Sequence, residues 1–122
     1  MMTRLITVLS VLFLTTTLSA QTVVSIDSVS AYTGQHIKVC SLVTDIYQPK
    51  GDNKPTYINF GGRYPDHTFT VVIFAKDLVN FPFSPVEKYK NQNVCVTGMA
   101  ADYKGKPQIV AKFSEQISIQ KL

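Results

Sequence analysis

NVCVTGMAADYKGKPQIV, residues 93–110, is the segment that decides the fold expected for this chain. Its first ten residues, 93–102, predict a β-strand, and a second strand is predicted at residues 107–112. Between them lies Tyr103-Lys104-Gly105-Lys106, a hairpin turn whose glycine occupies the position that needs a positive φ. The segment therefore predicts an antiparallel hairpin with Cys95 near the middle of its first strand.

Three more strands are predicted before this hairpin, and one short strand after it. Residues 37–46 alternate imperfectly but are rich in β-branched side chains, which favour strands. Residues 69–74 are almost entirely apolar, which indicates a strand that is covered on both sides or central in a barrel. The other two predicted strands are residues 56–60 and, as an edge strand, residues 116–120.

Short helical segments are predicted in two of the connections. Residues 29–33 predict one or two helical turns that stop at Gly34, because glycine readily adopts the left-handed conformation that ends a helix. The long connection 76–91 suits a turn or two of helix, either at residues 77–81 or at residues 85–89.

The number and spacing of the strands predict an all-β fold. Five strands, with the long connection between the third and the fourth, match the OB-fold (oligonucleotide/oligosaccharide-binding fold), a five-stranded Greek-key barrel. A β-sandwich would need about seven strands with shorter connections. The prediction is thus an OB barrel with a short N-terminal helix and a short helix or loop between strands 3 and 4.

The two cysteines fit this topology. The first strand of an OB-fold lies beside the fourth, so Cys40 and Cys95 would be brought together. An even number of cysteines in a small exported domain favours a disulfide over a metal site or a nucleophile. Closing a loop of about 55 residues would stabilise the fold by about 4 kcal/mol in the chain-entropy model.

The N-terminus is typical of an export signal. Arg4 supplies a positive charge, residues 5–14 form an apolar run, and small and polar residues lead to Ala20, after which cleavage is expected. The apolar run is shorter than the roughly 20 residues that span a bilayer, so no stable membrane anchor is expected after cleavage. A buried N-terminal strand or a monotopic anchor is the alternative. We expect a signal peptide at 1–20 and one OB-fold domain at 21–122, in the periplasm or secreted.

Several segments give the chain a resemblance to a known group. The most specific are VCVTG (94–98) and YKGKPQI (103–109), and the others are YTGQ (32–35), KPTYINFG (54–61), YP (64–65) and FTVVI (69–73). With these segments the chain resembles a group of small exported bacterial OB-fold proteins that are nucleic-acid-binding-like. The resemblance implies the fold more firmly than the ligand, because one fold serves many functions.

The sequence does not predict an enzyme. An OB-fold nuclease would need clustered carboxylates for a metal ion and arginines on the phosphate, but Arg63 is the only arginine outside the predicted signal peptide. The acidic residues are scattered singly, and two cysteines with His36 and His67 do not match the spacing of a zinc site. No catalytic residue, metal or other cofactor is therefore expected.

A binding face is predicted where OB-folds usually hold their ligands, across strands 2 and 3 and the loops 1–2 and 4–5. Aromatic rings there would stack on bases or sugars at about 1–3 kcal/mol per base, and cations would follow phosphates. Each residue also has a structural interpretation: Tyr57 could face the core, Tyr64 could clamp a loop, and the lysines of the last turn could simply be solvated. The predicted ligand-binding residues are Tyr47, Lys50, Lys54, Tyr57, Asn59, Arg63, Tyr64, His67, Tyr103, Lys104 and Lys106.

Composition leaves three functional hypotheses. The formal net charge of +4, or +3 without Arg4, suits a single-stranded nucleic acid bound without base specificity, although such a surplus is ordinary for exported proteins. The alternative is an envelope module that binds an oligosaccharide, a peptidoglycan fragment or a protein partner. A third is an assembly accessory without a ligand, for which the edge strand 116–120 would be the contact.

Overall fold

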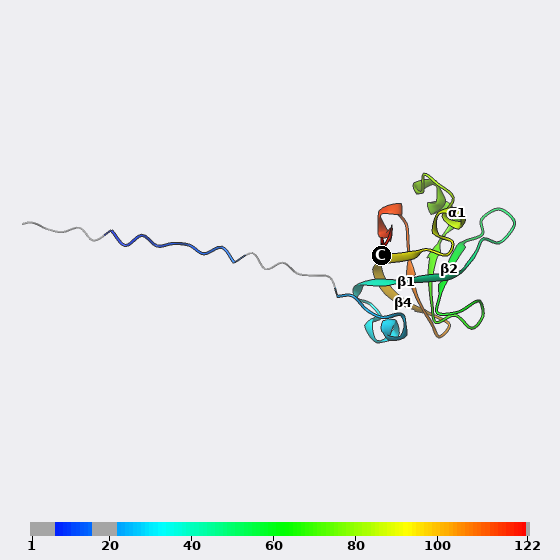
Figure 1. Cartoon of the computed structure of the whole chain (residues 1–122), viewed down its shortest axis with the longest axis horizontal. Helices are drawn as coiled ribbons and strands as arrows, with labels where there is room; N and C mark the ends of the chain where they lie inside the picture. Colours follow the sequence, from blue (N-terminus) through cyan, green and yellow to red (C-terminus); the bar gives the residue numbers. More distant parts are fainter. Residues whose placement is uncertain (1–6, 16–21, 122) are drawn as a thin grey trace, which may run out of the picture.

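The computed structural model describes residues 7–15 and 22–121 (Figure 1). Residues 7–15 form no helix or strand, and their side chains are exposed. The predicted cleavage point after Ala20 lies outside the described residues. Within the described ranges, no helix combines the length and the apolar character needed to cross a membrane.

The described part of the chain folds into a closed five-stranded β-barrel with a sixth strand at one edge. The strands follow the order β1-β2-β3-β5-β4, and pairing of β1 with β4 closes the barrel. Strands β3 and β5 are parallel, and the other neighbours are antiparallel. This confirms the predicted all-β, OB-like barrel. The strands are β1 (His36–Tyr47), β2 (Thr56–Phe60), β3 (Phe69–Ile73), β4 (Asn93–Tyr103), β5 (Lys106–Val110) and β6 (Ile117–Ile119).

The fifth strand is two residues shorter at its end than predicted. Strand β5 ends at Val110. After it, the backbone amides of Lys112 and Phe113 donate to Gln116 Oε1, at 2.7 and 3.1 Å, instead of to a neighbouring strand. The hairpin turn itself is tight, with Lys104 and Gly105 both at positive φ, as a type I′ turn requires.

Both helical alternatives in the long connection are present, as η2 (Ala75–Asn80) and α1 (Pro85–Tyr89). The start of helix α1 is capped: the Ser84 hydroxyl accepts a hydrogen bond from the Glu87 amide, and Pro85 stands in the first helical turn. The predicted N-terminal helix is the 3-10 helix η1 (Ile26–Tyr32), and a further 3-10 turn, η3 (Ser114–Gln116), precedes β6.

Strand β1 is long because it serves two partners. Its residues 36–42 pair with β4, and its residues from Val43 onward pair with β2. The register shifts between Val43 and Asp45, which leaves Thr44 as the extra residue of a β-bulge. The Thr44 hydroxyl contacts Gly62, donating to its carbonyl at 2.7 Å and lying 3.1 Å from its amide. The bulge therefore ties β1 to the loop that follows β2.

The barrel core consists of the inward side chains of all five strands. Ile58 faces the core, so Tyr57 faces outward. Tyr89 closes one end of the barrel: it is buried, and its hydroxyl lies 3.4 Å from the Ile117 carbonyl. Burial raises the pKa of Tyr89 to about 12, so the phenol stays protonated at neutral pH.

The predicted disulfide is present and joins Cys40 to Cys95, which are direct partners in the β1–β4 ladder. Val94 and Val96 belong to the core, so Cys95 points to the outer side of the barrel, as alternation along a strand requires. The bond therefore fastens the pair of strands that closes the barrel without using space in the core.

Candidate ligand-binding face

The outer surface of β1, β2, β3, β5 and the end of β4 carries five of the eleven predicted binding residues: Tyr47, Tyr57, Asn59, Tyr103 and Lys106. Antiparallel and parallel partners that lie opposite one another point to the same side of a sheet. The register therefore places the following side chains together, and we call this set the outer face: Asp45, Tyr47, Tyr57, Asn59, Thr70, Val72, Gln108, Val110, Ala101, Tyr103 and Lys106.

One end of the outer face is formed by tyrosines and valines. Tyr47 lies opposite Tyr57, Tyr57 opposite Val72, and Val72 opposite Val110. Tyr47 is exposed and Tyr57 is half-buried, so both rings are accessible. Val72 is only 4% exposed, so this row offers a ligand mainly the two tyrosine rings.

The centre of the outer face is a row of hydrogen-bonded polar side chains. The Asn59 amide donates to Asp45 Oδ2 at 3.2 Å, and the Thr70 hydroxyl lies 2.7 Å from Asn59 Oδ1. Asp45 Oδ2 also accepts the Tyr64 amide at 3.1 Å, and this bond is the main cause that lowers the pKa of Asp45. Asn59 is 2% exposed, so the structure places this predicted ligand residue inside the sheet's own hydrogen-bond network.

The loop between β2 and β3 folds back onto the outer face. It begins at Gly61, whose φ is +75° and where a Cβ would lie 2.5 Å from the Thr68 hydroxyl, so only glycine fits. Lys106 on β5 holds the loop by donating to the carbonyls of Pro65 at 3.1 Å and His67 at 2.7 Å. His67 is 6% exposed beneath Tyr64, with ring centroids 5.8 Å apart, while the Tyr64 ring is 73% exposed.

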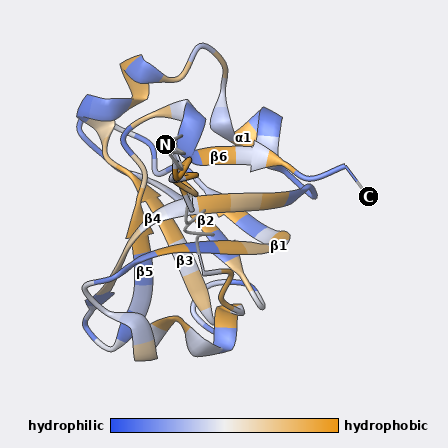
Figure 2. Ribbon diagram, turned by 90° about the vertical axis from the view of Figure 1, so that its left-hand side faces the viewer, coloured by the Kyte–Doolittle hydropathy of each residue, from blue (hydrophilic) through white to orange (hydrophobic). Residues whose placement is uncertain are grey.

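The β4–β5 hairpin supplies the last aromatic residue. Tyr103 is exposed, and the ammonium of Lys104 lies 5.4 Å from the centre of its ring. Tyr103 is the direct partner of Lys106, so the hairpin and the β2–β3 loop meet at the same end of the barrel. In Figures 1 and 2 this end lies opposite the end that carries α1.

The structure gathers the predicted residues into three groups. Exposed rings are contributed by Tyr47, Tyr64 and Tyr103, with Tyr57 half-buried beside Tyr47. Lys50, Lys54 and Lys104 are exposed cations in the flanking loops. Asn59, His67 and Lys106 instead hold the face together through hydrogen bonds or packing. Sequence reasoning overlooked Thr70, Val72, Gln108 and Val110, which the period-2 pattern of β3 and β5 places on the same side as Tyr57.

Arg63 is not in the outer-face set; it lines a cavity of about 370 Å³, together with Asp45. The cavity also includes Lys90, which sequence reasoning did not select because it lies 27 residues further along the chain. Its lining residues are Val43, Thr44, Asp45, Ile46, Arg63, Lys90 and Asn91.

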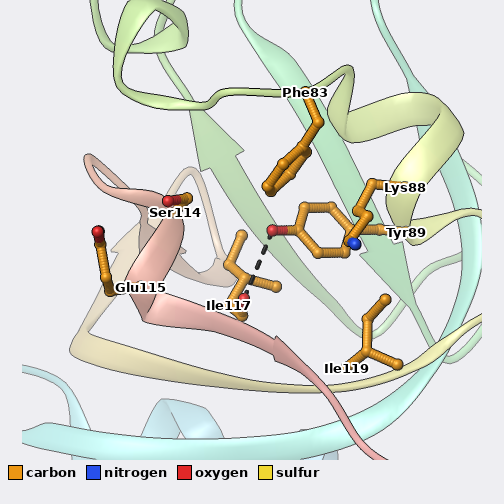
Figure 3. A pocket seen from close by; sticks show the side chains of 7 residues that line it. All are labelled: Phe83, Lys88, Tyr89, Ser114, Glu115, Ile117 and Ile119. Carbon is orange, nitrogen blue, oxygen red and sulfur yellow. Dashed lines mark hydrogen bonds between the residues drawn. The ribbon is translucent and has the colours of Figure 1, made fainter.

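A second hollow of about 240 Å³ lies between α1 and β6, which Figure 2 shows side by side. Phe83 and Tyr89 meet edge to face with centroids 5.6 Å apart, and Lys88 lies 5.3 Å from the centre of the Phe83 ring. Figure 3 shows these three side chains on one side of the hollow and Ile117 and Ile119 nearby. The hollow is mainly apolar and stands well away from the outer face.

No known protein-family model matches the sequence, and a search of curated proteins finds no match. Among residues 7–15 and 22–121, no three His, Cys, Asp or Glu side chains gather as metal ligands would.

The buried His67 makes stability dependent on pH. Burial lowers the pKa of His67 below its ordinary 6.5, and the charge of Lys106 adds to this effect. Below pH 6.5 the imidazole of His67 is protonated more readily in the unfolded chain than in the folded chain. The free energy of unfolding therefore decreases as the pH falls. We expect urea midpoints to be lower at about pH 5.5 than at about pH 7.5.

The matched variants for this experiment are His67→Gln and His36→Gln. His36 is exposed on β1, whereas His67 is buried under the β2–β3 loop. His67→Gln should flatten the change in urea midpoint over this pH range, and His36→Gln should leave it as it is in the parent protein. An unchanged pH dependence in His67→Gln would contradict the role given to the buried imidazole.

Proposed function

We propose that this protein is an exported OB-fold module that binds single-stranded nucleic acid without base specificity on the outer face. The observation that carries the proposal is the arrangement of tyrosine rings around a rigid polar centre, at the two edges of the β1–β2–β3–β5 surface. Bases stack on such rings whatever their identity, since every base has a π-face.

Weak base specificity follows from the hydrogen bonds at the centre of the face. Reading a base edge needs free donors and acceptors, as asparagine provides for adenine. Here the Asn59 side chain is bonded to Asp45 and to Thr70, so it has little left to offer a base. Stacking and phosphate contacts then dominate, and both are tolerant of sequence.

Charge supports the same ligand class. The chain has twelve lysines and arginines against eight acidic residues. The lysines of the β1–β2 loop and of the β4–β5 hairpin flank the outer face, and Lys50, Lys54 and Lys104 are exposed. If a phosphodiester backbone crossed the face, these lysines would neutralise phosphates at both edges and release their counterions, which favours binding.

Export belongs to the same proposal. A structural disulfide forms and persists in oxidising compartments, and both cysteines of the chain are used in one bond. Together with the predicted signal peptide, this supports a periplasmic or secreted protein of the small bacterial OB-fold group that the sequence resembles.

An oligosaccharide is the second candidate ligand, and the exposed acids at the hairpin end favour it. Asp66 and Asp102 are exposed near Tyr64 and Tyr103. Carboxylates accept hydrogen bonds from sugar hydroxyls but repel phosphates, and tyrosine rings stack on sugars as well as on bases. The salt dependence of binding distinguishes the two ligand classes, because only phosphate-driven binding weakens steeply as salt is added.

The test is a fluorescence titration of the oxidised mature protein with a labelled oligothymidine and with a peptidoglycan-derived oligosaccharide at two salt concentrations. We expect the oligothymidine to bind with a log affinity that falls by about 0.7 per phosphate contact for each decade of salt. Removing one stacking ring, by Tyr64→Ala or Tyr103→Ala, should weaken binding about 5-fold to 150-fold, the equivalent of 1–3 kcal/mol.

The control is Phe113→Ala, which removes an exposed ring outside the outer face; its side chain is 55% exposed. It should leave the affinity unchanged. If the oligothymidine does not bind at low salt, or if Phe113→Ala weakens binding as much as the tyrosine variants, the outer face is not a nucleic-acid site. Binding of the oligosaccharide alone, independent of salt, would establish the second candidate instead.

A further inference from the structure

The cavity beside Arg63 opens where β1 separates from β4. The last residue of β1 that pairs with β4 is Leu42, and the Val43 amide then donates to the Gln92 carbonyl at 2.8 Å. Beyond this point β1 pairs only with β2, so the space between β1 and the end of α1 is not filled by another strand. This gap is the cavity of about 370 Å³.

The cavity combines two cations with one carboxylate. Arg63 and Lys90 line it together with Asp45. Asp45 is ionised, because hydrogen bonds from the Tyr64 amide and the Asn59 side chain and the charge of Arg63 lower its pKa. Two cations against one carboxylate leave the lining with a surplus of one positive charge, which favours an anion.

The cavity is continuous with the outer face through shared residues. Asp45 lines the cavity and also belongs to the polar row of the outer face. Arg63 precedes Tyr64 directly, so the same loop supplies a cation to the cavity and an exposed ring to the outer face. The strand order β4-β5-β3-β2-β1 means that a ligand crossing the face from the β4–β5 hairpin reaches β1 and the cavity last.

We propose that the cavity is an oxyanion subsite that binds one backbone phosphate of the strand held on the outer face. This inference rests on the proposed function, because it names the place where the bound strand leaves the sheet. A guanidinium offers a planar pair of donors that matches two phosphate oxygens, and an ammonium adds a point charge. The Asn91 amide lies at the same cavity as a further neutral donor.

The experiment combines a protein variant with a modified oligothymidine. The double variant Arg63→Gln/Lys90→Gln removes both cations, and Lys76→Gln/Lys112→Gln removes two exposed lysines outside the cavity as the control. Each protein is titrated with oligothymidines in which one phosphate at a time is replaced by a neutral methylphosphonate. Circular dichroism and thermal unfolding establish that each variant is folded.

For the parent protein we expect one linkage, near one end of the bound segment, whose neutralisation weakens binding about tenfold. The cavity variant should bind the unmodified strand about tenfold more weakly, with a salt slope smaller by about 0.7. Neutralising that linkage should not weaken the binding of the cavity variant any further. The control variant should retain the effect of that linkage.

The outcomes separate this inference from the proposed function. If the parent protein binds oligothymidine but the cavity variant behaves like the control, the subsite is wrong and the outer face still stands. If neutralisation of the same linkage weakens the affinity of both variants equally, the phosphate is bound elsewhere. If the parent protein binds no oligothymidine, the proposed function fails, and the phosphodiester subsite fails with it.

Discussion

Replacing both cysteines, by Cys40→Ala/Cys95→Ala, should lower the free energy of unfolding by about 4 kcal/mol in the chain-entropy model. The bond joins residues 55 apart, so its loss frees a long loop in the unfolded chain. A domain of this size has a total stability of about 5–15 kcal/mol, so the loss is a large fraction of it. Urea unfolding of the parent protein and the double variant would measure the difference.

The control for this prediction is chemical reduction of the parent protein. Reduction restores the same freedom to the unfolded chain without changing any side-chain volume, so the reduced protein and the double alanine variant should unfold at similar urea concentrations. Both cysteines lie on the outer side of the barrel, which limits the packing lost on substitution. A variant as stable as the oxidised protein would show that the disulfide contributes nothing to the barrel closure.

Phe60→Ala should lower the free energy of unfolding by about 3–5 kcal/mol, the usual range for a buried phenylalanine. The Phe60 side chain is 1% exposed, and its ring lies 5.4 Å from that of Phe69, its direct partner on β3. Alanine would leave a cavity in the core where β2 meets the β2–β3 loop. Since this loop starts at the next residue and carries Tyr64, the proposed function predicts that binding of oligothymidine weakens as well.

Phe113→Ala is the matched control, because it removes an exposed ring of the same type. Its free energy of unfolding should change by no more than about 0.5 kcal/mol. The combined loss from Phe60→Ala and from reduction approaches the whole stability of a small domain. We therefore expect reduced Phe60→Ala to be unfolded without denaturant, and a folded circular dichroism spectrum would contradict this.

Local sequence signals predicted the elements of the barrel well. Residues 56–60 form β2 with the expected bounds, and residues 85–89, one of the two helical alternatives in the long connection, form α1. The pairing of Cys40 with Cys95 followed from the topology once the strands were assigned. Each of these features depends on neighbouring residues or on a pattern that runs along one strand.

The roles of the predicted site residues depended on contacts that no local pattern contains. Lys106 holds the β2–β3 loop through the carbonyl of His67, 39 residues away, so its ammonium is committed to the fold. Asn59 is occupied because β1 and β3 bring Asp45 and Thr70 to either side of it. Lys90 shares a cavity with Arg63 only because β1 leaves β4 at that point.

The division of β1 between two partners also constrains the order of events during synthesis. Residues 36–42 of β1 find their partners only at residues 93–99 of β4. No closed barrel can therefore exist until most of the chain has left the ribosome. Pairings so distant in sequence also form slowly. A chain that crosses a membrane with its N-terminus first would present β1 to the far side while β4 is still to come. It would thus complete its barrel, and its disulfide, only after transport.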